Sequence, residues 1–276
     1  MSLVVFLAVL LAAAVHAGWN GLVKAAVDKA TATRFVAFGA GVVGALALPF
    51  LEPPASAALP WLAVSAVLQI GYYALLAAAY RAVDLTVAYP LMRGLAPMLV
   101  AIAGAALFGE ALGLGGWVGV AAISAGVAGL VFAGRARRAG LIFAVANAAV
   151  IAAYTVVDAH AARLSGAPVA YAAWEAIATA VPLALWGLKR GDVAPGRIDL
   201  RSLAVGLVGG AATTTSYAIA LWAMTQAPVA VVAALRETSI VFALALGRGV
   251  FGEPIGCARL IAAAVVVAGV VVLKTA

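Results

Sequence analysis

Four ionisable side chains lie deep inside long apolar segments of this 276-residue chain: Arg93, Glu175, Arg236 and Glu237. A charged group at the centre of a membrane helix costs roughly 2.5–3.5 kcal/mol, so these side chains are expected to face a polar cavity or one another. A guanidinium matches the oxygens of a carboxylate or phosphonate, and a buried carboxylate can receive an ammonium group or carry a proton. The pattern indicates a binding site for a small charged molecule. A buried ion-pair network that only joins the helices is the alternative.

Polar and aromatic residues form stripes at helical spacing. His16, Trp19 and Asn20 share one face of a helix, and a later segment repeats this arrangement less closely with Asn147 and Tyr154. We predict that these stripes line the same cavity, although His16 is equally explained as a structural histidine. Three further tyrosines complete the predicted substrate-binding set: Tyr72, Tyr73 and Tyr89. Three carboxylates are candidates for proton coupling: Glu175, Glu237 and Asp158.

The composition identifies the environment in which these residues work. The chain is 67% hydrophobic and 10% charged, with a mean hydropathy of +1.16, whereas soluble domains are about 25% charged. Ten apolar segments are long enough to span a bilayer as helices, and their short connections exclude a large domain outside the membrane. We therefore predict an all-α, ten-helix integral membrane protein with segments at 3–24, 31–51, 59–80, 84–108, 113–133, 139–161, 167–188, 200–224, 227–251 and 255–274.

The same composition limits cofactors and partners. One cysteine, Cys257, excludes an intramolecular disulfide, and two histidines leave little room for a metal centre. We expect no cofactor, no metal and no nucleic acid, with the lipid bilayer and a small-molecule substrate as partners. The sequence leaves a monomer and a homodimer equally open.

Basic residues predict the orientation in the membrane. The connections after the even-numbered segments and the C-terminus hold two, Arg163 and Lys274, while those after the odd-numbered segments hold thirteen. By the positive-inside rule, the odd-numbered connections are predicted to be cytoplasmic and both termini to lie on the other side. The thirteen are Lys24, Lys29, Arg34, Arg81, Arg135, Arg137, Arg138, Lys189, Arg190, Arg197, Arg201, Arg248 and Arg259.

The chain also repeats itself. A shift of 143 residues aligns 93–127 with 236–270 without a gap, and ten of these 35 positions are identical. The matches include Arg93 with Arg236, Gly104 with Gly247, and the tripeptide 108–110 with 251–253, both Phe-Gly-Glu. We predict two five-helix repeats, 1–135 and 139–276. Because five is odd, the second repeat is inverted relative to the first, which is typical of transporters with a midplane site.

These features resemble the drug/metabolite transporter superfamily, EamA type. The resemblance covers essentially the whole chain and includes the motifs His16-x-x-Trp19-Asn20-x-x-x-Lys24 and Tyr89-Pro90-x-x-Arg93-Gly94-x-x-Pro97. It implies a ten-helix transporter. Family members are commonly drawn with both termini in the cytoplasm, opposite to the orientation that the charges predict here.

Two local expectations follow from the residue types. Pro90, Gly94 and Pro97 are predicted to break or loosen the helix around Arg93. Glu110 and Glu253, at corresponding helix junctions, are predicted to be structural and to cap the helix that follows each of them. Lys24 is expected to reach the membrane surface, outside the site.

We therefore predict a secondary transporter of the cell (inner) membrane that exports a small polar metabolite, amino-acid-like or anionic. We expect alternating access, with the halves rocking about a central site, and proton coupling. The alternative is a multidrug exporter of lipophilic cations that uses Glu175 or Glu237 as the cation and proton site; uptake also remains open. An enzyme is not expected, because GxSxG and HExxH motifs are absent from the sequence.

Overall fold

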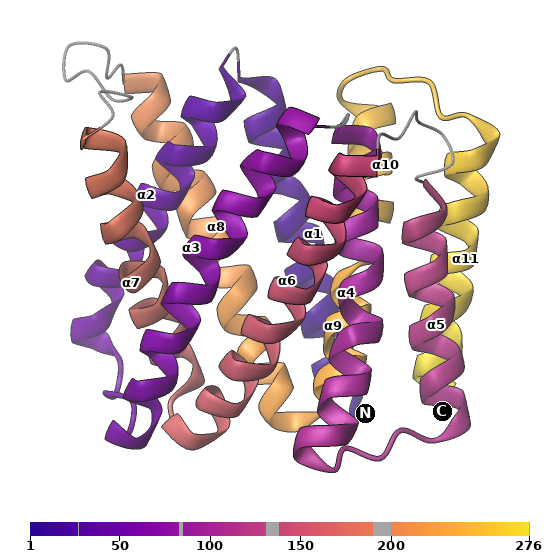
Figure 1. Cartoon of the computed structure of the whole chain (residues 1–276), viewed down its shortest axis with the longest axis horizontal. Helices are drawn as coiled ribbons and strands as arrows, with labels where there is room; N and C mark the ends of the chain where they lie inside the picture. The colour runs from indigo at the N-terminus through magenta and orange to yellow at the C-terminus, as the bar shows by residue number, and fades with distance from the viewer. Residues whose placement is uncertain (27, 83–84, 131–137, 190–199, 276) are drawn as a thin grey trace.

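The computed structural model describes residues 1–26, 28–82, 85–130, 138–189 and 200–275. Upright helices fill the molecule, and two short 3-10 turns, Leu48–Phe50 and Ser56–Ala58, precede the third helix (Figure 1). The predicted segment ends at 84 and 133 and the predicted repeat boundary at 135 lie outside the described residues. The helices are α1 (Leu3–Ala25), α2 (Lys29–Ala47), α3 (Leu59–Ala82), α4 (Leu85–Phe108), α5 (Leu114–Gly129), α6 (Arg138–Ser165), α7 (Pro168–Lys189), α8 (Leu200–Gln226), α9 (Val229–Arg236), α10 (Ser239–Gly249) and α11 (Cys257–Thr275).

These helices make ten passes through the bundle. Within the described ranges, nine helical stretches are long and apolar enough to cross a membrane, and the shorter apolar α5 makes the tenth. The prediction of an all-α membrane protein with ten helices is confirmed. The two helices α9 and α10 form a single pass that is interrupted in its middle.

The interruption lies in a different pass from the predicted one. The pass of α4 is a continuous helix although Pro90 and Pro97 lie inside it, so the prediction of a break there is wrong. The break falls instead at Glu237 and Thr238, between α9 and α10, where no proline occurs. Proline still loosens α4, because Pro97 has no N–H to donate to the carbonyl of Arg93 four residues earlier.

The two repeats interleave. The first helix of each repeat packs against helices of the other: α1 lies against α8 and α10, and α6 lies against α3 and α4. The last helices, α5 and α11, pack together at one side of the bundle (Figure 1). Most of the strong packing therefore joins one repeat to the other.

Glycine permits the closest of these contacts. A Cβ on Gly39 of α2 would lie 2.1 Å from the carbonyl oxygen of Gly206 of α8, and one on Gly210 would lie 2.3 Å from the nitrogen of Ala40. Between α5 and α11, a Cβ on Gly269 would lie 2.9 Å from the carbonyl oxygen of Gly119. Small residues at these crossings let the backbones touch, which is how helices gain packing energy in lipid.

Both termini lie at the same end of the bundle, which we call the termini face (Figure 1). The helix ends that carry Lys24, Arg81, Arg201 and Arg259 lie at the other end, the opposite face. Arg135, Arg137, Arg190 and Arg197 lie outside the described residues. The assignment of the opposite face to the cytoplasm stays a prediction.

Glu110 does not cap the helix that follows it, and Glu110 and Glu253 both form ion pairs. The N-cap of α5, Gly113, receives no side-chain hydrogen bond, and Glu110 instead bonds Arg163 of α6 and the first residue of α9. Glu253 pairs with Lys24 of α1. Each carboxylate is held by the other repeat, so the capping prediction is wrong for Glu110, and Lys24 is more than an interfacial residue.

The glycine contact between α2 and α8 generates a testable prediction. Gly39→Ala forces its Cβ against backbone atoms that cannot rotate away, and we expect a loss of about 1–3 kcal/mol in stability. Gly71→Ala in α3, where a Cβ would meet nothing within 4 Å, is the matched control and is expected to be neutral or slightly stabilising. Thermal unfolding of the purified variants in detergent measures both; equal melting temperatures contradict the packing argument.

Candidate functional site

An ion pair between the two repeats lies at the centre of the bundle. Arg93 Nε donates to Glu237 Oε2 at 2.9 Å, and Arg93 Nη2 lies 2.9 Å from Glu237 Oε1. Only 12% of the Arg93 side chain and 7% of the Glu237 side chain are exposed. Two parallel bonds of this kind are the strongest geometry available to a guanidinium and a carboxylate.

The break between α9 and α10 is a tight turn that places two charged residues side by side. Arg236 is the last residue of α9, and Glu237 and Thr238, which separate α9 from α10, keep helical φ and ψ values. The turn keeps its backbone bonded: the N–H groups of Glu237 and Thr238 donate to the carbonyls of Ala234 and Leu235. The Thr238 hydroxyl also donates to the Leu235 carbonyl at 2.7 Å.

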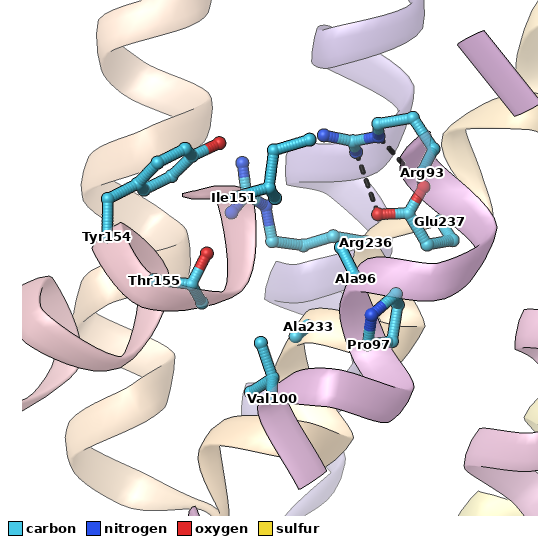
Figure 2. A pocket seen from close by; sticks show the side chains of 10 residues that line it. All are labelled: Arg93, Ala96, Pro97, Val100, Ile151, Tyr154, Thr155, Ala233, Arg236 and Glu237. Carbon is cyan, nitrogen blue, oxygen red and sulfur yellow. Dashed lines mark hydrogen bonds and ion pairs between the residues drawn. The ribbon is translucent and has the colours of Figure 1, made fainter. Parts of the chain in front are cut away.

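Arg236 differs from Arg93 in its partners. Its guanidinium carbon lies 5.2 Å from the centre of the Tyr217 ring, a cation–π contact. Among the described residues, Arg236 has no carboxylate within ion-pair distance. Figure 2 shows its side chain extending toward Tyr154, while dashed lines join Arg93 to Glu237. Within the described ranges, Arg93 is therefore the arginine that forms an ion pair, and Arg236 is the one that does not.

The two arginines and Glu237 line a small pocket between α4, α6 and α9 (Figure 2). Its cavity volume is about 10 Å³, which is roughly the space of one water molecule. In this conformation the pocket is too small for a metabolite. The other lining residues are Ala96, Pro97, Val100, Ile151, Tyr154, Thr155 and Ala233.

Helix α1 brings a polar group near this pocket. Trp19 Nε1 donates to His16 Nδ1 at 3.2 Å, and Asn20 Nδ2 donates to the His16 carbonyl at 2.8 Å. The stripe predicted on this helix is thus bonded within itself. His16 also lies within reach of the positive charges of Arg93 and Arg236.

Tyrosines surround the arginines on the other sides. Tyr72, Tyr89 and Tyr154 all lie within electrostatic reach of Arg93. The Tyr72 ring packs edge-on against Tyr154 and Tyr73, with centroids 6.0 and 5.1 Å apart. Their faces and hydroxyls offer a substrate both cation–π surface and hydrogen bonds.

Asp158 is fully buried beside this group. It accepts hydrogen bonds from the Tyr171 hydroxyl at 2.7 Å and from the Tyr217 hydroxyl. Tyr217 therefore contacts Arg236 with its ring and Asp158 with its hydroxyl. Tyr171 and Tyr217 are absent from the predicted substrate-binding set, because no spacing in the sequence shows that α7 and α8 bring them to Asp158.

Of the predicted site residues, Arg93, Tyr154, Arg236 and Glu237 belong to the pocket lining. The others lie outside it: His16, Trp19, Asn20, Tyr72, Tyr73, Tyr89, Asn147, Asp158 and Glu175. Glu175 is buried in α7, where the Thr179 hydroxyl donates to its Oε1 at 2.7 Å. Asn147 is fully buried and donates to Met92 Sδ at 2.9 Å. The structure groups Arg93, Arg236 and Glu237 with Tyr154, and separates Glu175 and Asn147 from that lining.

Comparisons with known proteins agree with this architecture. The model of the EamA-like transporter family matches residues 3–132 and 138–275. No curated protein matches the chain. One solved structure, described only as "Crystal structure of protein", aligns over 98% of this chain and 98% of its own, with a TM-score of 0.76 and 22% identity, and so shows the same fold.

The partners of the two arginines predict different effects on stability. Arg93→Met leaves the buried Glu237 carboxylate without a cation, and we expect a loss of about 3–5 kcal/mol. Adding Glu237→Gln removes the orphaned charge, so the double variant is expected to regain much of that loss. Arg236→Met breaks no ion pair and is the matched control. Thermal unfolding of the four proteins tests this; equal destabilisation by the two arginine variants contradicts the assignment of the pair.

Proposed function

This chain belongs to the EamA-like transporter family, and we propose that it carries a small polar metabolite with an anionic group, either amino-acid-like or a simple anion. The family consists of membrane transporters of the drug/metabolite type, and the chain is a multi-pass membrane protein. We place it in the cell (inner) membrane and propose export by alternating access. The substrate class and the mechanism are the parts that need testing.

The observation that carries the substrate class is the state of Arg236. Arg93 and Glu237 neutralise each other, so the pocket lining keeps one net positive charge, on Arg236. Among the described residues, none accepts a hydrogen bond from the Arg236 guanidinium. Its N–H groups are therefore available to bind two oxygens of one substrate. A carboxylate, phosphonate or similar group meets both the charge and the shape.

The tyrosines support a zwitterionic substrate as well as a simple anion. An ammonium group next to the bound carboxylate would lie among Tyr72, Tyr89 and Tyr154, whose ring faces attract cations. The Glu237 carboxylate is already occupied by Arg93. Amino-acid-like molecules therefore suit the site, and large lipophilic cations suit it less, because the free charge in the lining is positive.

Proton coupling is the finer proposal, and Asp158 supports it best of the three candidate carboxylates. Glu237 is held by Arg93, and Glu175 and Asp158 both lie outside the pocket lining. Asp158 reaches Arg236 through a single residue, Tyr217. Protonation of Asp158 would weaken its hydrogen bond with the Tyr217 hydroxyl. Because the Tyr217 ring contacts the Arg236 guanidinium, that change would alter the position of the group that binds the substrate.

Glu175 is the residue that supports the alternative substrate class, lipophilic cations. Its buried carboxylate accepts from a hydroxyl and has no cation at ion-pair distance among the described residues. A lipophilic cation that reached α3 and α7 would find an unmatched negative charge there. This candidate makes a different prediction for the ligand test below.

The first experiment is ligand-induced thermal stabilisation of the purified protein with amino acids, phosphonates, other small anions and lipophilic cations. A ligand at 100 times its Kd stabilises the folded state by about 2.7 kcal/mol. We expect a shift with anions or zwitterions that is lost in Arg236→Gln and retained in Glu175→Gln. Stabilisation only by lipophilic cations, lost in Glu175→Gln, would overturn the anion assignment and establish the alternative.

The coupling proposal predicts a separate result in proteoliposomes. We expect Asp158→Asn to abolish accumulation driven by a pH gradient while substrate exchange without a gradient continues, because only the proton step is removed. Glu52→Gln, which removes an exposed carboxylate, is the control and should accumulate substrate normally. Gradient-driven accumulation by Asp158→Asn would show that the proton is carried elsewhere or that another ion is coupled.

A further inference from the structure

The repeated tripeptide Phe-Gly-Glu forms the same local structure at its two occurrences. Gly109 and Gly252 have φ values of +62° and +65°, which turn the chain at the ends of α4 and α10. The next N–H, of Glu110 or Glu253, donates back to the carbonyl of Gly104 or Gly247 at 3.2 and 3.0 Å. In each copy the glutamate Oε2 lies 3.2 Å from where a Cβ on that glycine would be. Both repeats thus contain the same turn, which places the glutamate carboxylate against a glycine of the preceding helix.

At the termini face, this glutamate holds three helices together. Glu110, at the end of α4, lies 2.6 Å from Arg163 Nη2 at the end of α6 and accepts from the N–H of Val229 at the start of α9 at 2.9 Å. Arg163 Nε also donates to the carbonyl of Met224 at 3.0 Å. Phe108 stacks on His160 of α6, with centroids 5.3 Å apart. We call this cluster the termini-face latch.

At the opposite face, the second copy holds α10 to α1. Glu253 lies 2.6 Å from Lys24 Nζ, and the same ammonium lies 5.0 Å from the centre of the Phe251 ring. Lys24 lowers the pKa of the Glu253 carboxyl, so this glutamate is ionised at neutral pH. The two side chains are 43% and 39% exposed, against 34% and 13% for Arg163 and Glu110. We call this pair the opposite-face latch; it is the more solvated of the two.

The two latches follow one rule. In each, the glutamate of the Phe-Gly-Glu in one repeat forms an ion pair with a basic residue near the end of the first helix of the other repeat, which is α6 or α1. The inversion of the repeats puts one latch on each face of the membrane. The termini-face latch ties together α4, α6 and α9, which are the helices that line the pocket. The opposite-face latch ties α10 to α1, which carries His16 and Trp19.

We propose that the two Phe-Gly-Glu elements are the two gates of the transport cycle, each released when the central site opens toward its own face. Both latches are formed in this structure, and the central cavity holds no more than about a water molecule, which is the state expected when both gates are shut. Opening to the termini face separates α4 from α6 and breaks the Glu110–Arg163 pair. Opening to the other face separates α10 from α1 and breaks the Glu253–Lys24 pair. This inference rests on the proposed alternating access and is independent of the substrate class.

The test uses access to the site rather than transport. Cys257→Ser removes the single cysteine, and Ala96→Cys places a thiol in the pocket lining. A membrane-impermeant maleimide is then applied to right-side-out and to inverted vesicles. A separate Glu52→Cys protein, in the exposed connection between α2 and α3, identifies the vesicles in which the termini face is open to the reagent.

We expect Glu110→Gln to increase labelling at position 96 from the termini face, and Glu253→Gln to increase it from the opposite face. Loss of one partly exposed ion pair with its hydrogen bonds should change the rate about three- to tenfold. Glu52→Gln, a carboxylate on the termini face outside both latches, should label like the parent. Exchanging the charges in Lys24→Glu with Glu253→Lys should return labelling toward the parental rate.

Three outcomes overturn the proposal: labelling of both glutamine variants from the same face, no change in either, or charge exchange without recovery. Thermal unfolding of each variant separates a lost gate from a lost fold. Because no substrate is added, opposite shifts in labelling support the gates even where the ligand panel fails. A successful panel with unchanged labelling leaves the transport proposal intact and removes the gates.

Discussion

Lipid cannot solvate a charge, and this constraint explains the centre of the molecule. Three ionisable residues of the pocket lining meet there, and Arg93 and Glu237 satisfy each other through a bidentate pair between the repeats. The break between α9 and α10 places Arg236 and Glu237 next to each other, and Glu237 and Thr238 keep helical φ and ψ values with their N–H groups bonded to Ala234 and Leu235. The pairing of Arg93 with Glu237 is therefore a consequence of the cost of burying charge.

The two repeats differ at the position that follows each arginine. The shift of 143 residues aligns Arg93 with Arg236, but it aligns Gly94 with Glu237. Gly94 has its own role, because a Cβ there would lie 2.6 Å from the nitrogen of Ala128 in α5. One repeat uses the position for close packing and the other uses it for a carboxylate. Only Arg93 forms an ion pair with that carboxylate, so the pocket lining retains the positive charge of Arg236, which a symmetric pair of repeats would have either doubled or cancelled.

Hydropathy and segment length predict the ten passes because backbone groups in lipid must be satisfied within each helix. The cost of burying charge likewise singles out Arg93, Arg236 and Glu237. The sequence does not predict the features that depend on contacts between helices. Two prolines predict that α4 is broken or loosened, yet α4 continues through both of them, and the real break, between α9 and α10, has no proline. The partners of Glu110, Glu253 and Asp158 lie on helices far away in the sequence, so no local pattern reveals them.

The packing also restricts how the site can open. The closest backbone contacts, α2 with α8 and α5 with α11, each join one repeat to the other. Two rigid halves that rocked apart would have to disturb both of these close glycine contacts. We infer that these contacts stay closed while α1, α4, α6 and the α9–α10 pass move between them. That pass already contains a break beside Arg236, and Pro97 leaves the Arg93 carbonyl without its helical bond, so both arginine-bearing passes have a weakened helical ladder at the site itself. We propose that bending there changes the separation of the helix ends at each face, where the two latches lie, and so links the occupancy of the pocket to the proposed gates.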